Sequence, residues 1–255
     1  MKIRTLLPLF ITASTFYSCS VSQYIPPTVS APLFKEPNEA VLQGFIGLNH
    51  AEVQAAYSFK GNFAMMTDIW IGDDKRFSAE LAPGFYFKGK NNFCIEGFAG
   101  VGFASASTVD ESTRNSVLSG IKYTVKYETT APYQFIFIQP GLGYRSRHWE
   151  IAVAPRISYV NYSDFYYSKF EKDNNYQRNY KLIEKVDKGQ MAGWTLQPTL
   201  MVRAGLKKVK VFVSTSINFI SFNNGLILAS RDFVPFGHPF LLSVGIHLRL
   251  GSKGE

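Results

Sequence analysis

The 255-residue chain has only two cysteines and, beyond residue 20, no long apolar run. Two cysteines cannot build a disulfide framework. No stretch beyond residue 20 approaches ~20 consecutive apolar residues, which excludes a mature transmembrane helix. Zinc-ligand spacings, phosphate-binding loops and dinucleotide fingerprints are also missing from the sequence. It therefore predicts no cofactor and no metal site.

Acidic residues are the minority, since 27 Lys and Arg outnumber 19 Asp and Glu and give a net charge of +8. A nucleic-acid site would combine such an excess with stacking aromatic residues and arginines in one platform, which this chain lacks. We therefore expect no nucleic-acid partner. The basic residues gather instead in short gaps that contain no acid, and a rim of this kind suits anionic phospholipid headgroups. They are Lys60, Lys88, Lys90, Arg145, Arg147, Lys207 and Lys208.

Short stretches of alternating apolar and polar residues are abundant, and the chain is rich in Phe (22) and Tyr (14). In 209–220, for example, Val209 and Val211 share one face and Lys210 lies on the other, which is the period of a β-strand. Such stretches are long enough to cross a bilayer as tilted strands, which takes ~9–11 residues. The predicted strands are 40–48, 51–59, 62–71, 77–88, 93–104, 133–145, 149–161, 195–206, 209–220 and 239–250.

The gaps between these stretches are alternately short and long, with 105–132 and 162–194 among the longest. Successive connections of an up-and-down barrel fall on opposite ends, so one end carries tight turns and the other carries loops. We therefore predict an all-β fold, an up-and-down antiparallel transmembrane β-barrel of about ten strands with short periplasmic turns and long extracellular loops. Eight strands is the alternative, because 40–48 and 51–59 are joined only through Asn49-His50.

If the apolar face meets lipid, the polar face fills the lumen, and the charges on that face segregate along the chain. An unpaired buried charge costs several kcal/mol, so we expect the two signs to meet across a narrow interior as an ion-pair network. Asp68, Glu96 and Arg203 are expected at its centre, and a polar pore is the alternative. The acidic set is Glu52, Asp68, Glu80 and Glu96, and the basic set is Arg156, Arg203, Lys210 and Arg249.

Three regions are expected along the chain. Residues 1–18 have the basic start and apolar run of a signal peptide. Cys19 follows a small residue, as in a lipoprotein signal, which predicts its acylation; an ordinary leader with an incidental cysteine is the alternative. Residues 19–39 contain four prolines and no periodicity, which indicates an extended tether, and 40–255 form the barrel. This leader resembles that of lipoproteins of the Bacteroidetes type, in which an acidic cluster just after the cysteine resembles a surface-export signal. No such cluster follows Cys19, so the resemblance implies a lipid held in the periplasmic leaflet.

The early segment 39–57 reads Glu39-Ala40-Val41-Leu42-Gln43-Gly44 and, further on, Gln54-Ala55-Ala56-Tyr57. Together with the leader and the tether, this segment resembles the small outer-membrane β-barrel proteins and lipoproteins of the Bacteroidetes type. The resemblance implies an outer-membrane barrel and no catalytic residue. The predicted localisation is therefore the outer membrane, with a lipid anchor at Cys19 if that residue is acylated.

The predicted topology does not bring catalytic groups together. The four histidines are scattered, and Ser243 lies four residues from His247 on one strand face, about 13 Å away. A nucleophile and its base cannot hydrogen-bond over that distance. Asp73-Asp74 beside His50 or His238 would form a protease-like group, but nothing in the spacing requires it. We expect the protein not to be an enzyme.

The long gaps are the candidates for contact with partners. Residues 162–194 combine tyrosines with basic residues, which suits another envelope protein, a glycan or lipopolysaccharide phosphate. A hairpin that extends the barrel above the membrane explains the same aromatic residues. Residues 221–238 are apolar for a loop and either fold into the barrel mouth or meet a partner. The expected contact residues are Tyr166, Tyr167, Lys169, Tyr176, Arg178 and Tyr180.

The sequence as a whole predicts a non-enzymatic barrel surrounded by outer-membrane lipid. Its expected role is interaction or envelope structure, including that of an accessory subunit in an outer-membrane complex. Two alternatives stay open. A narrow pore would follow from the polar lumen, whereas a soluble periplasmic lipid-binding barrel would invert the faces and put the aliphatic residues inside.

Overall fold

The structure, a computed structural model, describes residues 27–46, 50–72, 76–115, 122–173, 180–222 and 240–251. The predicted signal peptide and Cys19 lie outside these ranges. Within them the chain forms one 3-10 turn, η3 (Lys60–Asn62), and fifteen strands. The strands are β1 (Ala40–Ile46), β2 (His50–Ser58), β3 (Phe63–Gly72), β4 (Phe77–Lys88), β5 (Phe93–Ser105), β6 (Thr108–Asn115), β7 (Lys122–Thr130), β8 (Pro132–Arg145), β9 (Trp149–Val153), β10 (Arg156–Asp173), β11 (Lys181–Gln197), β12 (Thr199–Gly205), β13 (Val209–Ile217), β14 (Phe219–Phe222) and β15 (Phe240–Leu250). These ranges contain no helix that is long and apolar enough to cross a membrane.

The strands form a closed antiparallel barrel with a wall of ten strands. The first strand, β1, pairs with β2 on one side and with the last strand, β15, on the other, and this second pairing closes the sheet. Some wall strands are interrupted: Pro155 separates β9 from β10, and Pro198 separates β11 from β12. Proline has no N–H to donate to a neighbouring strand, which accounts for these interruptions. The ten-stranded all-β prediction is confirmed, and the eight-stranded alternative is wrong.

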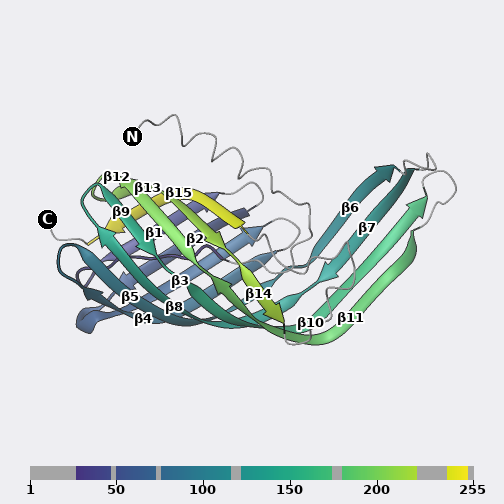
Figure 1. Ribbon diagram of the computed structural model, residues 1–255, viewed down its shortest axis with the longest axis horizontal. Coiled ribbons are helices and arrows are strands. Elements are labelled where there is room, and N and C mark those ends of the chain that lie inside the picture. The colour runs from purple at the N-terminus through teal and green to yellow at the C-terminus, as the bar shows by residue number, and fades with distance from the viewer. Residues whose placement is uncertain are drawn as a thin grey trace.

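The two ends of the barrel differ in how the strands are connected (Figure 1). We call one the turn end, where β1 begins beside the last residue of β15, Leu250. Four short connections lie there, at 60–62, 89–92, 146–148 and 206–208. We call the opposite end, where β1 ends and β2 begins, the loop end.

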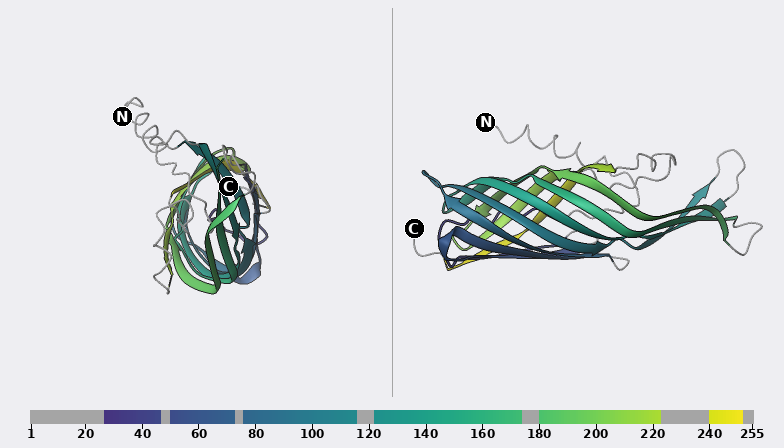
Figure 2. Two further views of the ribbon diagram at one scale, coloured as in Figure 1. Left: turned by 90° about the vertical axis from the view of Figure 1, so that its right-hand side faces the viewer. Right: turned by 90° about the horizontal axis from the view of Figure 1, so that it is seen from below.

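Four strands continue past the loop end as a sheet of their own (Figures 1 and 2). This loop-end extension consists of β6, β7 and the distal parts of β10 and β11, paired in that order. Register shifts near Tyr162 and Phe165 interrupt the β10–β11 ladder where the extension begins, and such bulges bend strands. The long gaps 105–132 and 162–194 are thus largely hairpins rather than irregular loops, as the hairpin alternative for 162–194 proposed.

Side chains alternate between the outer and inner faces of the wall. The outer face is apolar around the barrel, and its aliphatic residues are about half exposed. Examples from different strands are Val53, Ile69, Leu81, Val101, Ile138, Val211 and Val244. The inner face carries the polar residues of the same strands, and these are buried. The period-two pattern of the sequence therefore separates two surfaces of opposite polarity.

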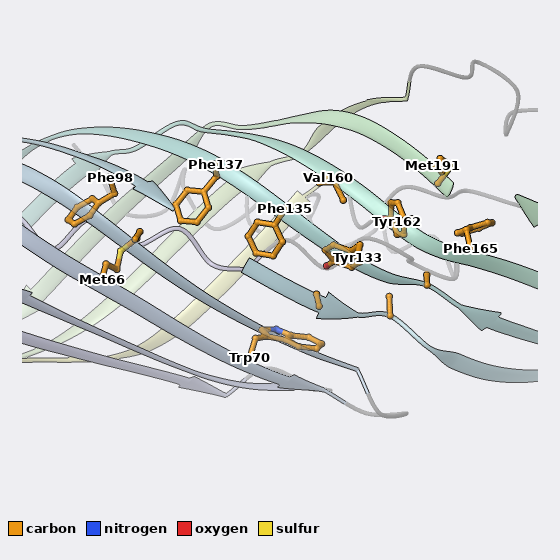
Figure 3. Close-up of a cluster of buried hydrophobic side chains, with 14 of the residues drawn as sticks. Met66, Trp70, Phe98, Tyr133, Phe135, Phe137, Val160, Tyr162, Phe165 and Met191 are labelled. Carbon is orange, nitrogen blue, oxygen red and sulfur yellow. The ribbon is translucent and has the colours of Figure 1, made fainter. Parts of the chain in front are cut away.

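Towards the loop end the inner face is aromatic rather than charged (Figure 3). Phe135, Phe137 and Tyr133 from β8 point inwards and lie near Tyr162 and Phe165 from β10. Glycines of β5 make room for these rings, since a methyl group at Gly102 would lie 2.2 Å from the ring of Phe135. The barrel interior thus has an aromatic region in addition to its charged one.

Candidate functional site

Residues 27–35 lie inside the barrel, and we call them the N-terminal strap. All nine are buried, and Val29, Leu33 and Phe34 have no exposed surface at all. The sequence suggested a tether over residues 19–39, but the structure places the strap in the lumen and leaves residues 19–26 outside the described ranges. The candidate functional site is therefore the lumen together with the segment that occupies it.

The wall holds the strap mainly through its backbone carbonyl groups. Six inward side chains donate hydrogen bonds to six strap carbonyls: Gln197 to Pro27, Gln54 to Thr28, Gln139 to Ser30, Arg203 to Ala31, Arg249 to Pro32 and Arg145 to Leu33. The bonds from Arg203 and Arg249 measure 2.6 and 2.7 Å. Because every residue has a carbonyl group, this recognition depends little on the side chains of the strap.

Acidic side chains of the wall accept the N–H groups of the strap. The carboxylate of Glu52 accepts the N–H of Thr28 at 2.9 Å and also its hydroxyl at 2.8 Å. The carboxylate of Glu96 accepts the N–H of Leu33 at 2.8 Å. Prolines 27 and 32 carry no N–H, so the strap presents fewer buried donors than another sequence would. A proline-rich segment is therefore well suited to a lumen that has mainly donors to offer.

A first ion-pair group lies where the strap leaves the lumen at the turn end. Arg145 binds Glu39 through two parallel hydrogen bonds of 2.7 and 2.8 Å, and the Arg249 guanidinium lies 3.5 Å from the same carboxylate. Glu39 directly precedes β1 and is completely buried. Two-point Arg–carboxylate pairs are both strong and geometrically specific, so this group fixes the strap to the base of the wall.

A second group surrounds Glu150 of β9. Its carboxylate lies 2.8 Å from Arg203, 3.1 Å from Lys210 and 3.4 Å from Arg249. All four side chains are at most 2% exposed. One carboxylate thus serves three cations, and two of these also hold strap carbonyls. Removing Glu150 would take the carboxylate from Arg203 and Lys210 and leave Arg249 with Glu39 alone, and breaking buried charge pairs in this way is strongly destabilising.

A third group lies further up the lumen, on β4, β8 and β10. Arg156 binds Glu80 through bonds of 2.8 and 2.9 Å, and its guanidinium lies 4.2 Å from the centre of the Phe137 ring. Gln139 accepts two further bonds from Arg156 while donating to the strap. Arg156 therefore joins the charged region, the aromatic region and the strap.

The structure buries all eight charged residues predicted for the lumen, which are Glu52, Asp68, Glu80, Glu96, Arg156, Arg203, Lys210 and Arg249. Their pairing differs from the expectation. Glu80 and Arg156 meet across the lumen as predicted, but Arg203, Lys210 and Arg249 meet Glu150 instead of the acidic strands. Asp68 is not central, because no donor reaches its carboxylate oxygens within the described chain. Glu96 holds the strap, so of the three expected central residues only Arg203 lies in the main network.

Sequence reasoning missed Glu39, Arg145 and Glu150 as members of the lumen site. Glu150 could have been found, because it shares the polar face of the predicted strand 149–161 with Arg156. Arg145 was counted in the basic rim at the turns, whereas it is buried and points into the lumen. No periodic signal marks the strap, so nothing in the pattern placed residues 27–35 inside.

The residues considered for catalysis have other partners within the described ranges. His247 lies 3.4 Å from Gln43, and Ser243 bonds to Thr28 of the strap, so these two residues engage different partners. His50 stacks on Trp70 with ring centres 5.4 Å apart. The parts of the chain that the structure describes contain no cluster of His, Cys, Asp and Glu suited to a metal ion. Asp73-Asp74 and His238 lie outside the described residues.

The contact residues predicted in 162–194 fall on the loop-end extension. Tyr167 is buried and stacks on Tyr127, so its assignment as a contact residue was wrong. Tyr166 is half-buried beneath the ammonium group of Lys185, and Lys169 lies 3.7 Å from Glu171. Tyr180 is exposed, with two lysines near its ring. Tyr176, Arg178 and residues 223–238 lie outside the described ranges.

No protein-family model matches this chain, and no curated protein matches it significantly. The function is therefore proposed from the geometry of the barrel, its lumen and its strap.

Proposed function

We propose that the protein is a non-enzymatic outer-membrane β-barrel that its own N-terminal strap keeps closed. Its role is interaction or envelope structure, with the loop-end extension as the part that meets a partner. The observation that carries this proposal is the separation of polarity: a closed sheet with an apolar outer face surrounds a charged, occupied lumen.

The outer face supports a lipid surround. A soluble protein keeps large continuous apolar patches off its surface, because contact with water disfavours them. Here aliphatic residues are exposed on wall strands all round the barrel. The pairing of β1 with β15 closes the wall, so no sheet edge is left unpaired along it. An open edge would expose unpaired backbone N–H and C=O groups to hydrocarbon, which a bilayer does not tolerate. The soluble lipid-carrier alternative requires aliphatic residues inside, which is the opposite of the observed arrangement.

The interior favours a closed barrel over a pore. The strap occupies the charged part of the lumen, and each of six successive or near-successive carbonyls is bound to the wall. A conducting lumen would need mobile water along the same path. We therefore expect a narrow pore only in a barrel from which the strap has been removed.

The loop-end extension supports an interaction role. The ammonium groups of Lys126 and Lys172 lie 5.9 and 5.8 Å from the ring centre of the exposed Tyr180. Exposed tyrosine flanked by lysines suits a phosphate-bearing or acidic partner, such as lipopolysaccharide, a glycan or another envelope protein. In this role the protein would be an accessory subunit of a larger outer-membrane complex.

Cell fractionation combined with gel mobility before and after boiling tests the proposal. We expect the protein in the outer-membrane fraction, with a mobility that changes on boiling because a folded barrel resists detergent. The variant Cys19→Ala should keep the barrel and the mobility change while losing the mass of an acyl anchor. Recovery in the soluble periplasm with no change on boiling would overturn the proposal.

A further inference from the structure

The strap runs through the barrel in a defined direction. Its C-terminal side is fixed at the turn end, where the N–H of Asn38 donates to the carbonyl of Ser58 at 2.7 Å and Glu39 pairs with Arg145. Ser58 and Arg145 are the turn-end residues of β2 and β8. Followed backwards from Glu39, the chain therefore enters the lumen from the turn end.

The other side of the strap reaches the upper wall. The carbonyl of Pro27 accepts a bond from Gln197, which precedes Leu206 at the turn end by nine residues. At ~3.3 Å per residue and a strand tilt of ~40°, Gln197 lies about 23 Å above that turn. Thr28 binds Glu52, only two residues from the loop-end start of β2. The strap thus passes along most of the lumen and ends near the loop-end rim of β2.

We propose that the lumen is a conduit for the protein's own polypeptide, which carries the residues before Pro27 out through the loop end. The inference rests on the proposed outer-membrane barrel, with the turn end taken to face the periplasm as the sequence predicts, and it places the N-terminal residues on the cell surface. The carbonyl-directed contacts fit a conduit, because they hold an extended backbone without requiring particular side chains.

The chain before Pro27 has no alternative route back to the turn end. A second pass through the lumen would compete with the strap for the groups that already bind its backbone, among them Arg203, Arg249 and Glu96. A path down the outer wall would put unpaired backbone N–H and C=O groups into hydrocarbon, at several kcal/mol each. The remaining exit is the loop end.

The position of the lipid anchor follows from this route. Cys19 precedes Pro27 by eight residues, which span at most ~29 Å when fully extended. That length suffices to clear the nearby rim of β2, but the periplasmic leaflet lies at the opposite end of the barrel. An acyl chain on Cys19 would therefore enter the outer leaflet, in contrast to the periplasmic leaflet that the sequence favoured.

Single cysteines labelled on intact cells with a membrane-impermeant biotin maleimide test the route. Gln23→Cys reports the segment before the strap, Asp74→Cys reports the β3–β4 connection at the loop end, and Lys207→Cys reports the turn end. The unsubstituted protein, labelled in parallel, sets the background from Cys19 and Cys94. None of the three substituted residues belongs to the strap or to the wall residues that bind it.

We expect Gln23→Cys and Asp74→Cys to be labelled on intact cells, and Lys207→Cys only after the outer membrane has been permeabilised. Labelling of Asp74→Cys but not Gln23→Cys on intact cells would overturn the conduit and leave the proposed function standing. Labelling of Lys207→Cys but not Asp74→Cys would reverse the barrel and overturn both. Absence of the protein from the outer-membrane fraction would also overturn both.

Discussion

The outer and inner faces of the same ten strands are stabilised in different ways. Outward residues such as Ile138 and Val211 have no specific partner, and any apolar side chain of similar size serves there equally well. Inward residues such as Arg203 and Glu150 each have named partners at hydrogen-bond distance. One face therefore tolerates substitution within a class of residue, whereas the other depends on individual residues and on a segment from outside the wall.

This difference explains why the strap belongs to the fold. The wall alone would leave arginines and glutamines facing an empty lumen, with polar groups to be hydrated. The strap supplies carbonyl acceptors to these donors, and Glu39 and Glu150 supply the countercharge. The inner face is thus complete only with residues 27–39 in place.

Of the changes considered, deletion of the strap should alter the inner face most. Without residues 27–35, six wall side chains lose their acceptors and the lumen loses its occupant, so we expect discrete currents in planar bilayers where the intact protein is silent. The matched control Val29→Ala/Leu33→Ala keeps every carbonyl and should stay closed. A deletion variant whose gel mobility still changes on boiling, but which conducts no current, would contradict the conclusion that the strap closes the lumen.

Replacement of Glu150 by Gln should be the most damaging single change. Arg203, Lys210 and Arg249 would lose a shared carboxylate, and breaking a buried charge pair costs about 3–5 kcal/mol. Glu128→Gln is the matched control, because its partner Lys126 is partly exposed and such pairs contribute about 0–1 kcal/mol. Urea unfolding in lipid vesicles measures both, and equal losses would refute the central place of Glu150.

A charge on the outer face tests the lipid surround. Ile138→Arg puts a guanidinium where the barrel would meet hydrocarbon, and such a change near the bilayer midplane costs about 2–4 kcal/mol. The control Ile138→Leu should change stability by less than about 1.5 kcal/mol. If refolding into vesicles is as favourable for Ile138→Arg as for Ile138→Leu, this part of the wall does not face lipid.

A substitution that crowds the strap should lower the stability of the barrel by a smaller amount than the charge changes above. A Cβ at Gly143 would lie 2.5 Å from the Leu33 side chain and 2.7 Å from the Ile151 carbonyl oxygen, so Gly143→Ala overpacks the contact by about 1–3 kcal/mol. Gly44→Ala is the control, since nothing lies within 4 Å of a Cβ there. Thermal unfolding compares the two, and an equally stable pair would mean that the strap does not press on Gly143.

The sequence predicted what depends on periodicity. Alternation in 209–220 and similar stretches predicted ten strands, and in 149–161, 195–206 and 209–220 it separated the outward apolar residues from the inward polar ones. The same alternation placed Arg156 and Arg203 in the lumen. Where a segment continued as tyrosine-rich hairpin, as in 162–194, the pattern left a loop and a hairpin as alternatives, and only the register of β10 with β11 distinguishes them.

The position of the strap and the pairing of the lumen charges depend on contacts between distant residues, which the alternation of apolar and polar residues does not indicate. Prolines and small residues in 27–35 are equally typical of a tether in water and of a strap in a lumen. Their placement follows from acceptors meeting donors such as Arg249 and Gln197, which are far away in sequence. Likewise, Arg203 pairs with Glu150 rather than with Asp68 because the register of β9 with β12 places Arg203 and Glu150 directly opposite each other.

The thiol of Cys94 gives the most direct test of a lumen closed by the strap. Cys94 is fully buried on the inner face, with its sulfur 3.8 Å from the carbonyl oxygen of Leu33. In the folded barrel a small charged methanethiosulfonate should leave Cys94 unmodified in the intact protein and modify it in the variant without residues 27–35. Cys94→Ala identifies the signal from Cys19. Equal rates of modification at Cys94 with and without the strap would contradict the account.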